Sequence, residues 1–232
     1  MSDTYLNFYR QLKDFCAECS QPWPSERTLV AVSKYHPVAK VYAAYMAGQR
    51  DFGENYVAEL CEKAVQLSKM HAHPRWHFTG TLQGNKLTKL LPYVDVIHTL
   101  CSLKHARKIE SFLQQHPEKK IQAFVCVNLG AEKQKSGVLW DEIDPFVAQL
   151  LAVAPQLELL GLMAIPPRAV SLQASAQHVP RVYRDFVQKA RQIGQGKASL
   201  GMSADYQAAI LAGADYIRIG TEIFGTRPAV AP

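Results

Sequence analysis

The chain has 232 residues, of which 48% are hydrophobic and 20% are charged, and its formal net charge is +6. These proportions are usual for a soluble globular protein, and no apolar run approaches the roughly 20 residues that a transmembrane helix requires, so no membrane partner is expected. The basic residues are spread along the chain without a finger or RNP signature. We therefore expect a solvated basic surface and no nucleic-acid partner.

The length, the N-terminus and the cysteines give further expectations. A chain of 232 residues suits one (β/α)8 barrel, which predicts a single domain over residues 1–232. The sequence begins Met1-Ser-Asp-Thr-Tyr, without a basic patch followed by an apolar stretch, and this favours a cytoplasmic protein without a targeting segment. Of the five cysteines, Cys61, Cys101 and Cys126 lie in apolar patterns, so disulfides are not expected.

The first predicted element is an amphipathic helix over residues 3–19, which we expect to lie against the bottom or the side of the fold. Its apolar stripe consists of Tyr5, Phe8, Tyr9, Leu12 and Cys16. Cys16 and Cys19 have CxxC spacing, which can indicate redox or metal chemistry. Because there is no second CxxC and no thioredoxin-like context, packing or exposed thiols is the stronger interpretation.

Eight apolar segments with the character of buried strands follow along the chain. They lie at residues 28–34, 51–54, 76–82, 94–100, 121–129, 157–165, 198–202 and 216–224. Stretches with helical spacing separate them, and Pro37 is placed to start a helix while Gly48 and Gly213 are placed to end one, the second after a short helix over 204–212. Alternating strands and helices imply parallel pairing with right-handed crossovers. We therefore predict an α/β fold, a (β/α)8 TIM barrel over residues 28–225.

Candidate functional residues lie where the first and the last two strands end. The first strand ends at Lys34, and in such barrels the carboxyl ends of the strands face the active site, although a lysine capping a strand at the surface explains this residue alone. The loops after strands seven and eight commonly bind phosphate, and here they contain Ser203, Gly220 and Thr221. Because strand eight closes onto strand one, a phosphate there lies within reach of Lys34. This arrangement suits a phosphorylated aldehyde, or a phosphosugar ketose that forms a Schiff base.

Several motifs together resemble one known family in order and content. They are Ala31-Val-Ser-Lys34, Phe52-Gly-Glu-Asn-Tyr56, Trp76-His-Phe-Thr-Gly80 with Leu82-Gln-Gly-Asn-Lys86, Lys135-Ser-Gly137, Gly161-Leu-Met-Ala-Ile-Pro166, and Gly201-Met-Ser203 with Arg218-Ile-Gly-Thr221. This pattern resembles the YggS/PROSC pyridoxal phosphate homeostasis proteins from about the first strand to the end. Thr79 and Thr81 depart from the family, which more often has Ile and Pro there, and these changes alter the pocket wall.

The resemblance implies an alanine-racemase-like barrel, PLP fold type III, with an extra N-terminal helix and without the C-terminal β domain of the racemases. It implies that pyridoxal 5′-phosphate (PLP) is held as an internal aldimine on Lys34, with Asn55 near the cofactor ring. It further implies that Ser203, Gly220 and Thr221 hold the phosphate. The implied function is intracellular vitamin B6 homeostasis by a monomer that buffers PLP or delivers it to PLP-dependent apoenzymes.

Arg218, which by the same resemblance faces the pyridine nitrogen, bears on whether the protein is an enzyme. Arginine does not give up its proton in proteins, so it leaves that nitrogen unprotonated and the ring a poor electron sink. A racemase also needs two acid/base groups; Lys34 can be one, and the other is missing unless Tyr35, His77 or another residue at the top of the barrel serves. We therefore expect a carrier without catalytic residues, with a weak amino-acid racemase or another PLP-dependent enzyme as the alternative.

Histidines around the third strand raise the question of a metal site. His71 and His73 fall in a polar connection, so a solvated loop is favoured over zinc binding, and no metal is expected. His77 lies within the strand pattern and is best explained as a core histidine with a hydrogen-bond partner. Asn55 can also act as the N-cap of a helix that starts at Tyr56, and this role is compatible with cofactor contact.

Overall fold

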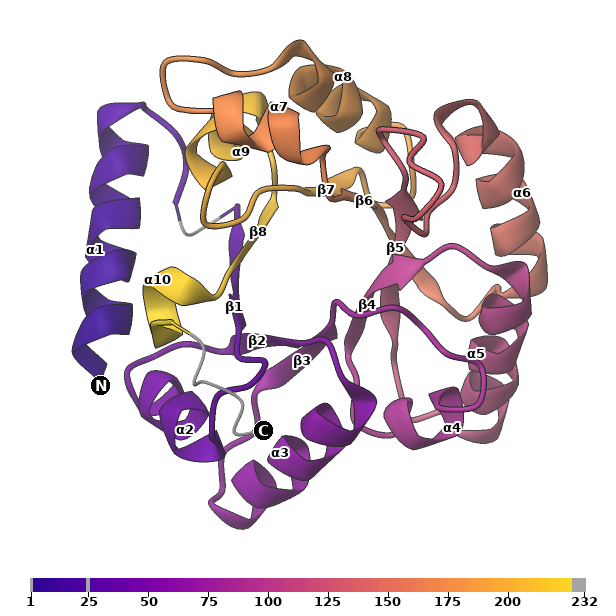
Figure 1. Cartoon of the computed structure of the whole chain (residues 1–232). Coiled ribbons are helices and arrows are strands. Elements are labelled where there is room, and N and C mark those ends of the chain that lie inside the picture. Colours follow the sequence, from indigo (N-terminus) through magenta and orange to yellow (C-terminus); the bar gives the residue numbers. More distant parts are fainter. Residues whose placement is uncertain (1, 24–25, 227–232) are drawn as a thin grey trace.

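The computed structural model describes residues 2–23 and 26–226, which form a closed barrel of eight parallel strands (Figure 1). The strands follow the order of the sequence around the barrel, and β8 pairs with β1 to close it. They are β1 (Thr28–Val32), β2 (Asp51–Glu54), β3 (Arg75–Phe78), β4 (Val96–Leu100), β5 (Gln122–Val127), β6 (Glu158–Ala164), β7 (Lys197–Ser199) and β8 (Tyr216–Ile219). The predicted (β/α)8 barrel is confirmed.

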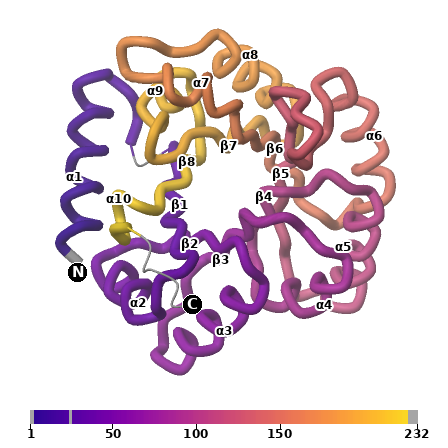
Figure 2. The backbone as a smooth tube through the Cα atoms, in the orientation of Figure 1, coloured from indigo at the N-terminus to yellow at the C-terminus, as the bar shows by residue number. Residues whose placement is uncertain are grey.

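The helices surround the barrel on its outside (Figure 2). They are α1 (Ser2–Glu18), α2 (Val38–Met46), α3 (Val57–Lys69), α4 (Leu87–Leu90), α5 (Leu103–Gln115), α6 (Ile143–Val153) after a short 3-10 helix (Trp140–Glu142), α7 (Arg168–Gln173), α8 (Arg181–Ala190), α9 (Tyr206–Ala212) and α10 (Thr221–Phe224). The predicted N-terminal helix is α1, which lies beside α10 against the side of the barrel (Figure 1). Within the described ranges, no helix is long and apolar enough to cross a membrane.

The predicted start and stop of α2 are confirmed, and so is the predicted stop of α9, which begins at Tyr206, two residues later than predicted. Pro37 is the N-cap of α2 with φ −66°, and Gly48, just after that helix, has φ 108°. Gly213 is the C-cap of α9 with φ 99°, a left-handed conformation that glycine adopts without a steric penalty.

The prediction for the eighth strand is wrong in its second half. The strand ends at Ile219, and residues 221–224 form the helix α10. Ile223 and Phe224 are buried on this helix, so their apolar character reflects core packing of a helix and not a longer strand. A short apolar run fits either element by periodicity alone. The turn from strand to helix brings Gly220 and Thr221 to the carboxyl-terminal mouth of the barrel.

Side chains of the strands alternate between the barrel interior and the helix-facing side. The interior cluster consists of Val30, Val96, Phe124, Cys126, Leu160, Met163 and Tyr216. A larger cluster lies between the strands and the helices and includes Phe52, Tyr183 and Phe186. The inward-facing residues nearest the carboxyl ends of the strands therefore form the floor of any site at the mouth.

A close backbone contact joins β6 to β7 at Gly161. This residue has φ 154°, and a Cβ built there would overlap the carbonyl oxygen of Lys197 on the neighbouring strand. The register of β5 against β6 shifts beside it, between Ala123 and Phe124. Only glycine fits this position without displacing backbone.

We predict that Gly161→Ala lowers the free energy of unfolding by about 3 kcal/mol, because the new methyl group must displace backbone of β7. Gly48→Ala is the matched control: Gly48 also has a positive φ, 108°, but a Cβ there meets nothing within 4 Å, so only backbone strain of about 1 kcal/mol is expected. Urea unfolding of the two variants measures the difference. Equal losses would show that the contact with Lys197 has no energetic effect.

Candidate functional site

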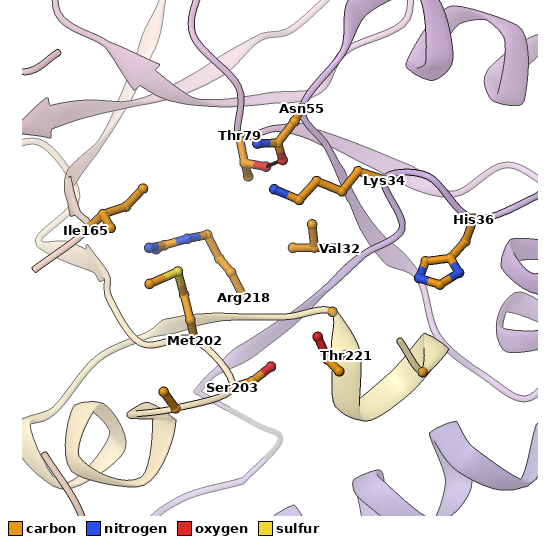
Figure 3. A pocket seen from close by; sticks show the side chains of 13 residues that line it. Val32, Lys34, His36, Asn55, Thr79, Ile165, Met202, Ser203, Arg218 and Thr221 are labelled. Atoms are coloured by element: carbon orange, nitrogen blue, oxygen red, sulfur yellow. Dashed lines mark hydrogen bonds between the residues drawn. The ribbon is translucent and has the colours of Figure 1, made fainter. Parts of the chain in front are cut away.

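A pocket of about 270 Å³ opens at the carboxyl ends of the strands, and we call it the mouth pocket. The structure brings together on its walls all six residues that the sequence singled out: Lys34, Asn55, Ser203, Arg218, Gly220 and Thr221. Figure 3 shows the Lys34 side chain extending toward Thr79 and Asn55, with the hydroxyl groups of Ser203 and Thr221 on another side of the pocket. An amine and a pair of hydroxyls therefore face the same small space.

Lys34 follows β1 and continues its inward-facing positions. Val30 belongs to the interior cluster and Val32 packs against it. Because side chains alternate between the two faces of a strand, the Lys34 side chain lies on the same inward side. The chain then turns at Tyr35, which has φ 67°, and the Tyr35 N–H donates to Glu59 Oε1 at 2.7 Å. The carboxylate of α3 thus holds the turn that presents the lysine.

A buried ionic cluster lies on the outer side of the same strand end. Lys63 Nζ donates to the carbonyl oxygen of Ser33 at 2.7 Å, to Glu54 Oε1 at 2.6 Å and to Glu59 Oε1 at 2.7 Å. Ser33 Oγ also donates to Glu54 Oε1, at 2.6 Å. All three protons of the ammonium are therefore used, and the cluster fixes Ser33, the neighbour of Lys34. The sequence does not predict this cluster, because its members come from β2, α3 and the residue that follows β1.

Two carboxylates in this cluster share one ammonium group. Burial raises the pKa of Glu54 to about 7, although Lys63 and the hydrogen bond from Ser33 oppose the rise. Glu54 is fully buried, and its Oε2 atom has no hydrogen-bond partner among the described residues. The carboxyl group consequently changes its protonation near neutral pH, a few atoms from the turn that carries Lys34.

The opposite wall of the pocket is built from the turn after β7 and the start of α10. Asp205, which is 2% exposed, accepts hydrogen bonds from Met202 N–H at 2.7 Å and from the Tyr183 hydroxyl at 2.5 Å. These bonds fix the turn that carries Ser203. A Cβ at Gly220 would lie 3.2 Å from the Val32 carbonyl oxygen, so glycine allows β8 and β1 to approach closely here.

Arg218 points inward from β8 and is 5% exposed. Its Nη1 atom donates to Ser199 Oγ at 2.7 Å and its Nη2 atom donates to the Ala164 carbonyl oxygen at 3.0 Å. Burial lowers the pKa of Arg218 to about 10, and this value leaves the guanidinium charged at neutral pH. A fixed, donor-only cation therefore forms part of the pocket floor.

Asn55 lines the pocket, but the predicted N-cap role is wrong. The N-cap of α3 is Tyr56, and the Asn55 carboxamide oxygen instead accepts a hydrogen bond from the Thr79 hydroxyl at 2.9 Å. The helix begins one residue later than expected because Asn55 continues the inward-facing positions of β2. The interaction with Thr79 links the ends of β2 and β3 at the pocket.

The histidines around β3 have different positions. His77 is fully buried, and both of its ring nitrogens have hydrogen-bond partners, as predicted for a core histidine. It lies in β3, two residues before Thr79, and is not among the residues that line the mouth pocket. Its suggested role as a second base is therefore wrong. His71 and His73 are exposed, and among the described residues no group of three or more His, Cys, Asp or Glu side chains is arranged to hold a metal ion.

Other pocket residues were not assigned to a site from the sequence. They include Val32, His36, Ile165, Met202 and Ala204. Four of these side chains are apolar or small and carry no chemical signal, and the ring of the fifth, His36, stacks on Phe224. Only the positions of their strand and loop ends predict that they line the mouth. The thiols of Cys16 and Cys19 lie elsewhere, on and just after α1, and both are free.

Residues 10–228 match the family model described as the N-terminal domain of alanine racemase. A Pseudomonas aeruginosa protein named pyridoxal phosphate homeostasis protein is 36% identical over 211 residues, which cover 90% of this chain and 88% of that protein. The Mus musculus protein of the same name is 38% identical over 209 residues, which cover 86% of this chain and 76% of that protein.

The fold is also similar to that of solved structures. PipY from Synechococcus elongatus, in a structure with PLP bound, superposes with a TM-score of 0.72 at 31% identity. The match covers 91% of this chain and 99% of that chain.

The Glu54 cluster gives a pH prediction. The unfolded carboxyl titrates near 4.5 and the folded one near 7, so between these values the folded state holds a proton that the unfolded state has released. The stability that this group contributes is therefore complete below about pH 4.5 and is lost as the pH rises through 7. Urea unfolding across this range should show that the wild type loses stability relative to Glu54→Gln as the pH rises. Glu62→Gln, at an exposed position, should show the same pH dependence as the wild type.

Proposed function

This chain belongs to the family of pyridoxal phosphate homeostasis proteins, and on that premise we propose that it binds PLP in the mouth pocket as a Schiff base on Lys34 and buffers or delivers it. The observation that carries the proposal is the meeting of Lys34 with Ser203, Gly220 and Thr221 in one pocket of about 270 Å³. We further propose that the protein acts as a cytoplasmic monomer that supplies PLP-dependent apoenzymes.

The pocket residues fit the chemical groups of PLP. Ser203 and Thr221 offer hydroxyl donors, and the first N–H groups of a helix such as α10 have no partner within the helix, which suits a phosphate. Gly220 leaves space where a side chain would press on Val32. The bound cofactor would supply an aldehyde carbon, with which the Lys34 amine condenses with loss of water.

Arg218 supports a carrier over an enzyme that needs a strong electron sink. Its guanidinium is held by Ser199 and Ala164 and carries donors only. Opposite a pyridine nitrogen such a group donates a hydrogen bond and leaves the nitrogen unprotonated, whereas enzymes that stabilise a carbanion strongly place a carboxylate there. Such a site would bind and orient the pyridine ring of PLP but would stabilise a carbanion only weakly.

A neighbouring cavity favours a weak amino-acid enzyme as the second candidate. This cavity has a volume of about 420 Å³ and shares Asn55, Thr79 and Ile165 with the mouth pocket. It therefore offers room for an amino acid beside the Lys34 amine. Thr99, Asn128 and Ser136 add polar groups to its walls.

We predict that the purified protein incubated with PLP shows an absorbance band near the visible edge and that Lys34→Ala abolishes it. Borohydride reduction followed by peptide mapping should locate the adduct on Lys34. Lys120→Ala, which removes an exposed lysine, should keep the band. A colourless wild-type protein would contradict the proposal and direct attention to phosphosugar ligands, and a band that persists in Lys34→Ala would contradict the assignment of the lysine.

Turnover separates the two candidate functions. If the protein is a carrier, racemisation of alanine or serine enantiomers by the PLP-loaded protein stays at the background level of Lys34→Ala, because one lysine cannot serve both faces of the α-carbon. Chiral chromatography of the reaction mixture measures this. Racemisation above that background that depends on Lys34 would favour the weak enzyme.

A further inference from the structure

A continuous line of polar side chains crosses the barrel interior, and we call it the interior chain. Asp51 Oδ1 lies 2.8 Å from His77 Nε2, and His77 Nδ1 lies 2.8 Å from His98 Nε2. His98 Nδ1 lies 2.9 Å from Ser199 Oγ, which accepts a hydrogen bond from Arg218 Nη1 at 2.7 Å. Four hydrogen bonds thus connect a carboxylate on β2 with the guanidinium in the mouth pocket.

The two ends of the interior chain determine the direction of every bond in it. Arg218 can only donate, so Ser199 Oγ accepts from it and its own hydroxyl proton is available for His98 Nδ1. A neutral His98 with an accepting Nδ1 carries its proton on Nε2, which then donates to His77 Nδ1. His77 in turn donates from Nε2 to the Asp51 carboxylate, which can only accept. This arrangement satisfies every donor and acceptor of the chain, with both histidines neutral.

Burial keeps the histidines in that neutral form. It lowers the pKa of His77, although the hydrogen bond and the negative charge of Asp51 oppose the shift. Burial also lowers the pKa of His98 well below its usual value, and the positive charges nearby, Arg218 among them, act in the same direction. Protonation of either ring would make His98 donate to Ser199, and the serine hydroxyl proton would lose its acceptor.

Apolar side chains surround the middle of the interior chain. The His98 ring lies 4.8 Å from the Phe124 ring and 6.1 Å from the Tyr216 ring, measured between centroids. Hydrogen bonds in such surroundings polarise one another, and their dipoles here all point from the cation toward the anion. Among the described residues the guanidinium of Arg218 forms no salt bridge, and the negative charge of Asp205 opposes the lowering of its pKa by burial.

The negative end of the interior chain lies at the opposite face of the barrel from the mouth pocket. Asp51 is the first residue of β2, and its side chain is 21% exposed. It lines a cavity of about 420 Å³ at that face, and Arg75 Nη1 lies 3.5 Å from its Oδ1 atom. The carboxylate is therefore partly solvated and does not bear the full cost of burying a charge.

We propose that Asp51, His77, His98 and Ser199 are positioning residues for Arg218: the interior chain holds the guanidinium in one orientation toward the mouth pocket. The proposal rests on the proposed function for the role of Arg218 toward PLP. The orientation of the guanidinium does not depend on a ligand. It can therefore be tested in the apo-protein, separately from the binding of PLP.

The first experiment uses the apo-protein with nitrogen NMR. The wild type should show His77 and His98 each protonated at Nε2 only, and separate Nη1 and Nη2 signals for an Arg218 guanidinium that rotates slowly. Asp51→Asn should give mixed tautomers and merge the two Arg218 signals. Asp144→Asn removes an exposed carboxylate that pairs with Lys189, and it should change neither readout. An Nδ1–H tautomer of His98 in the wild type, or unchanged Arg218 signals in Asp51→Asn, would overturn the proposal.

The second experiment measures the dissociation constant of PLP by absorbance titration. Asp51→Asn should raise it about 5-fold and Ser199→Ala about 10-fold, factors that correspond to about 1 and about 1.4 kcal/mol, the net contribution of an ordinary protein hydrogen bond. Ser199→Thr, which keeps the hydroxyl, should restore most of the affinity lost in Ser199→Ala. Asp144→Asn should bind like the wild type.

The outcomes of this titration distinguish the two proposals. Wild-type protein that does not bind PLP contradicts the proposed function, and the NMR experiment then decides the proposal on the interior chain. Wild-type binding together with variants that lose only thermal stability, and bind PLP like Asp144→Asn, shows that the interior chain is structural and overturns its role toward Arg218. Binding that weakens in the order given, with rescue by Ser199→Thr, supports it.

Discussion

The pairing of β8 with β1 is the contact on which the site depends. Its register aligns Val30 with Arg218 and Ala31 with Ile219, so the chain that follows each strand leaves the barrel at the same point of the mouth. Lys34 and Thr221 are thereby brought together from opposite ends of the sequence. The pocket exists only when the last strand has docked, and a ligand that binds it stabilises the closed barrel over any state that lacks this pairing.

Much of the fold and the positions of the site residues could be predicted from the sequence, because both follow from strand ends. The alternation of apolar strands with helical stretches predicts the parallel barrel, and the rule that active sites lie at the carboxyl ends selects Lys34 and the loops near Ser203 and Thr221. The error at residues 221–224 has the same source. Ile223 and Phe224 continue an apolar run whose periodicity does not distinguish a strand from one turn of helix.

The supporting interactions could not be predicted, because they depend on which side chains meet across strands. Glu54 and Lys63 are ordinary charged residues in the sequence, yet they form a buried pair with Ser33 that braces the turn at Lys34. His98 and Ser199 are separated by 100 intervening positions and meet only because the barrel places β4 opposite β7. Asn55 was expected to cap a helix, and its true partner, Thr79, comes directly after the next strand, β3.

The interior chain has a consequence for folding specificity that does not involve any ligand. Its five members come from β2, β3, β4, β7 and β8, one from each strand. Since side chains alternate between faces, sliding any of these strands by one residue would turn its member toward the helices and leave buried polar groups of its neighbours unsatisfied. An interior filled only with aliphatic residues would tolerate such a slip far better. The polar members thus favour one alignment of the strands, whereas a purely aliphatic barrel interior would permit several.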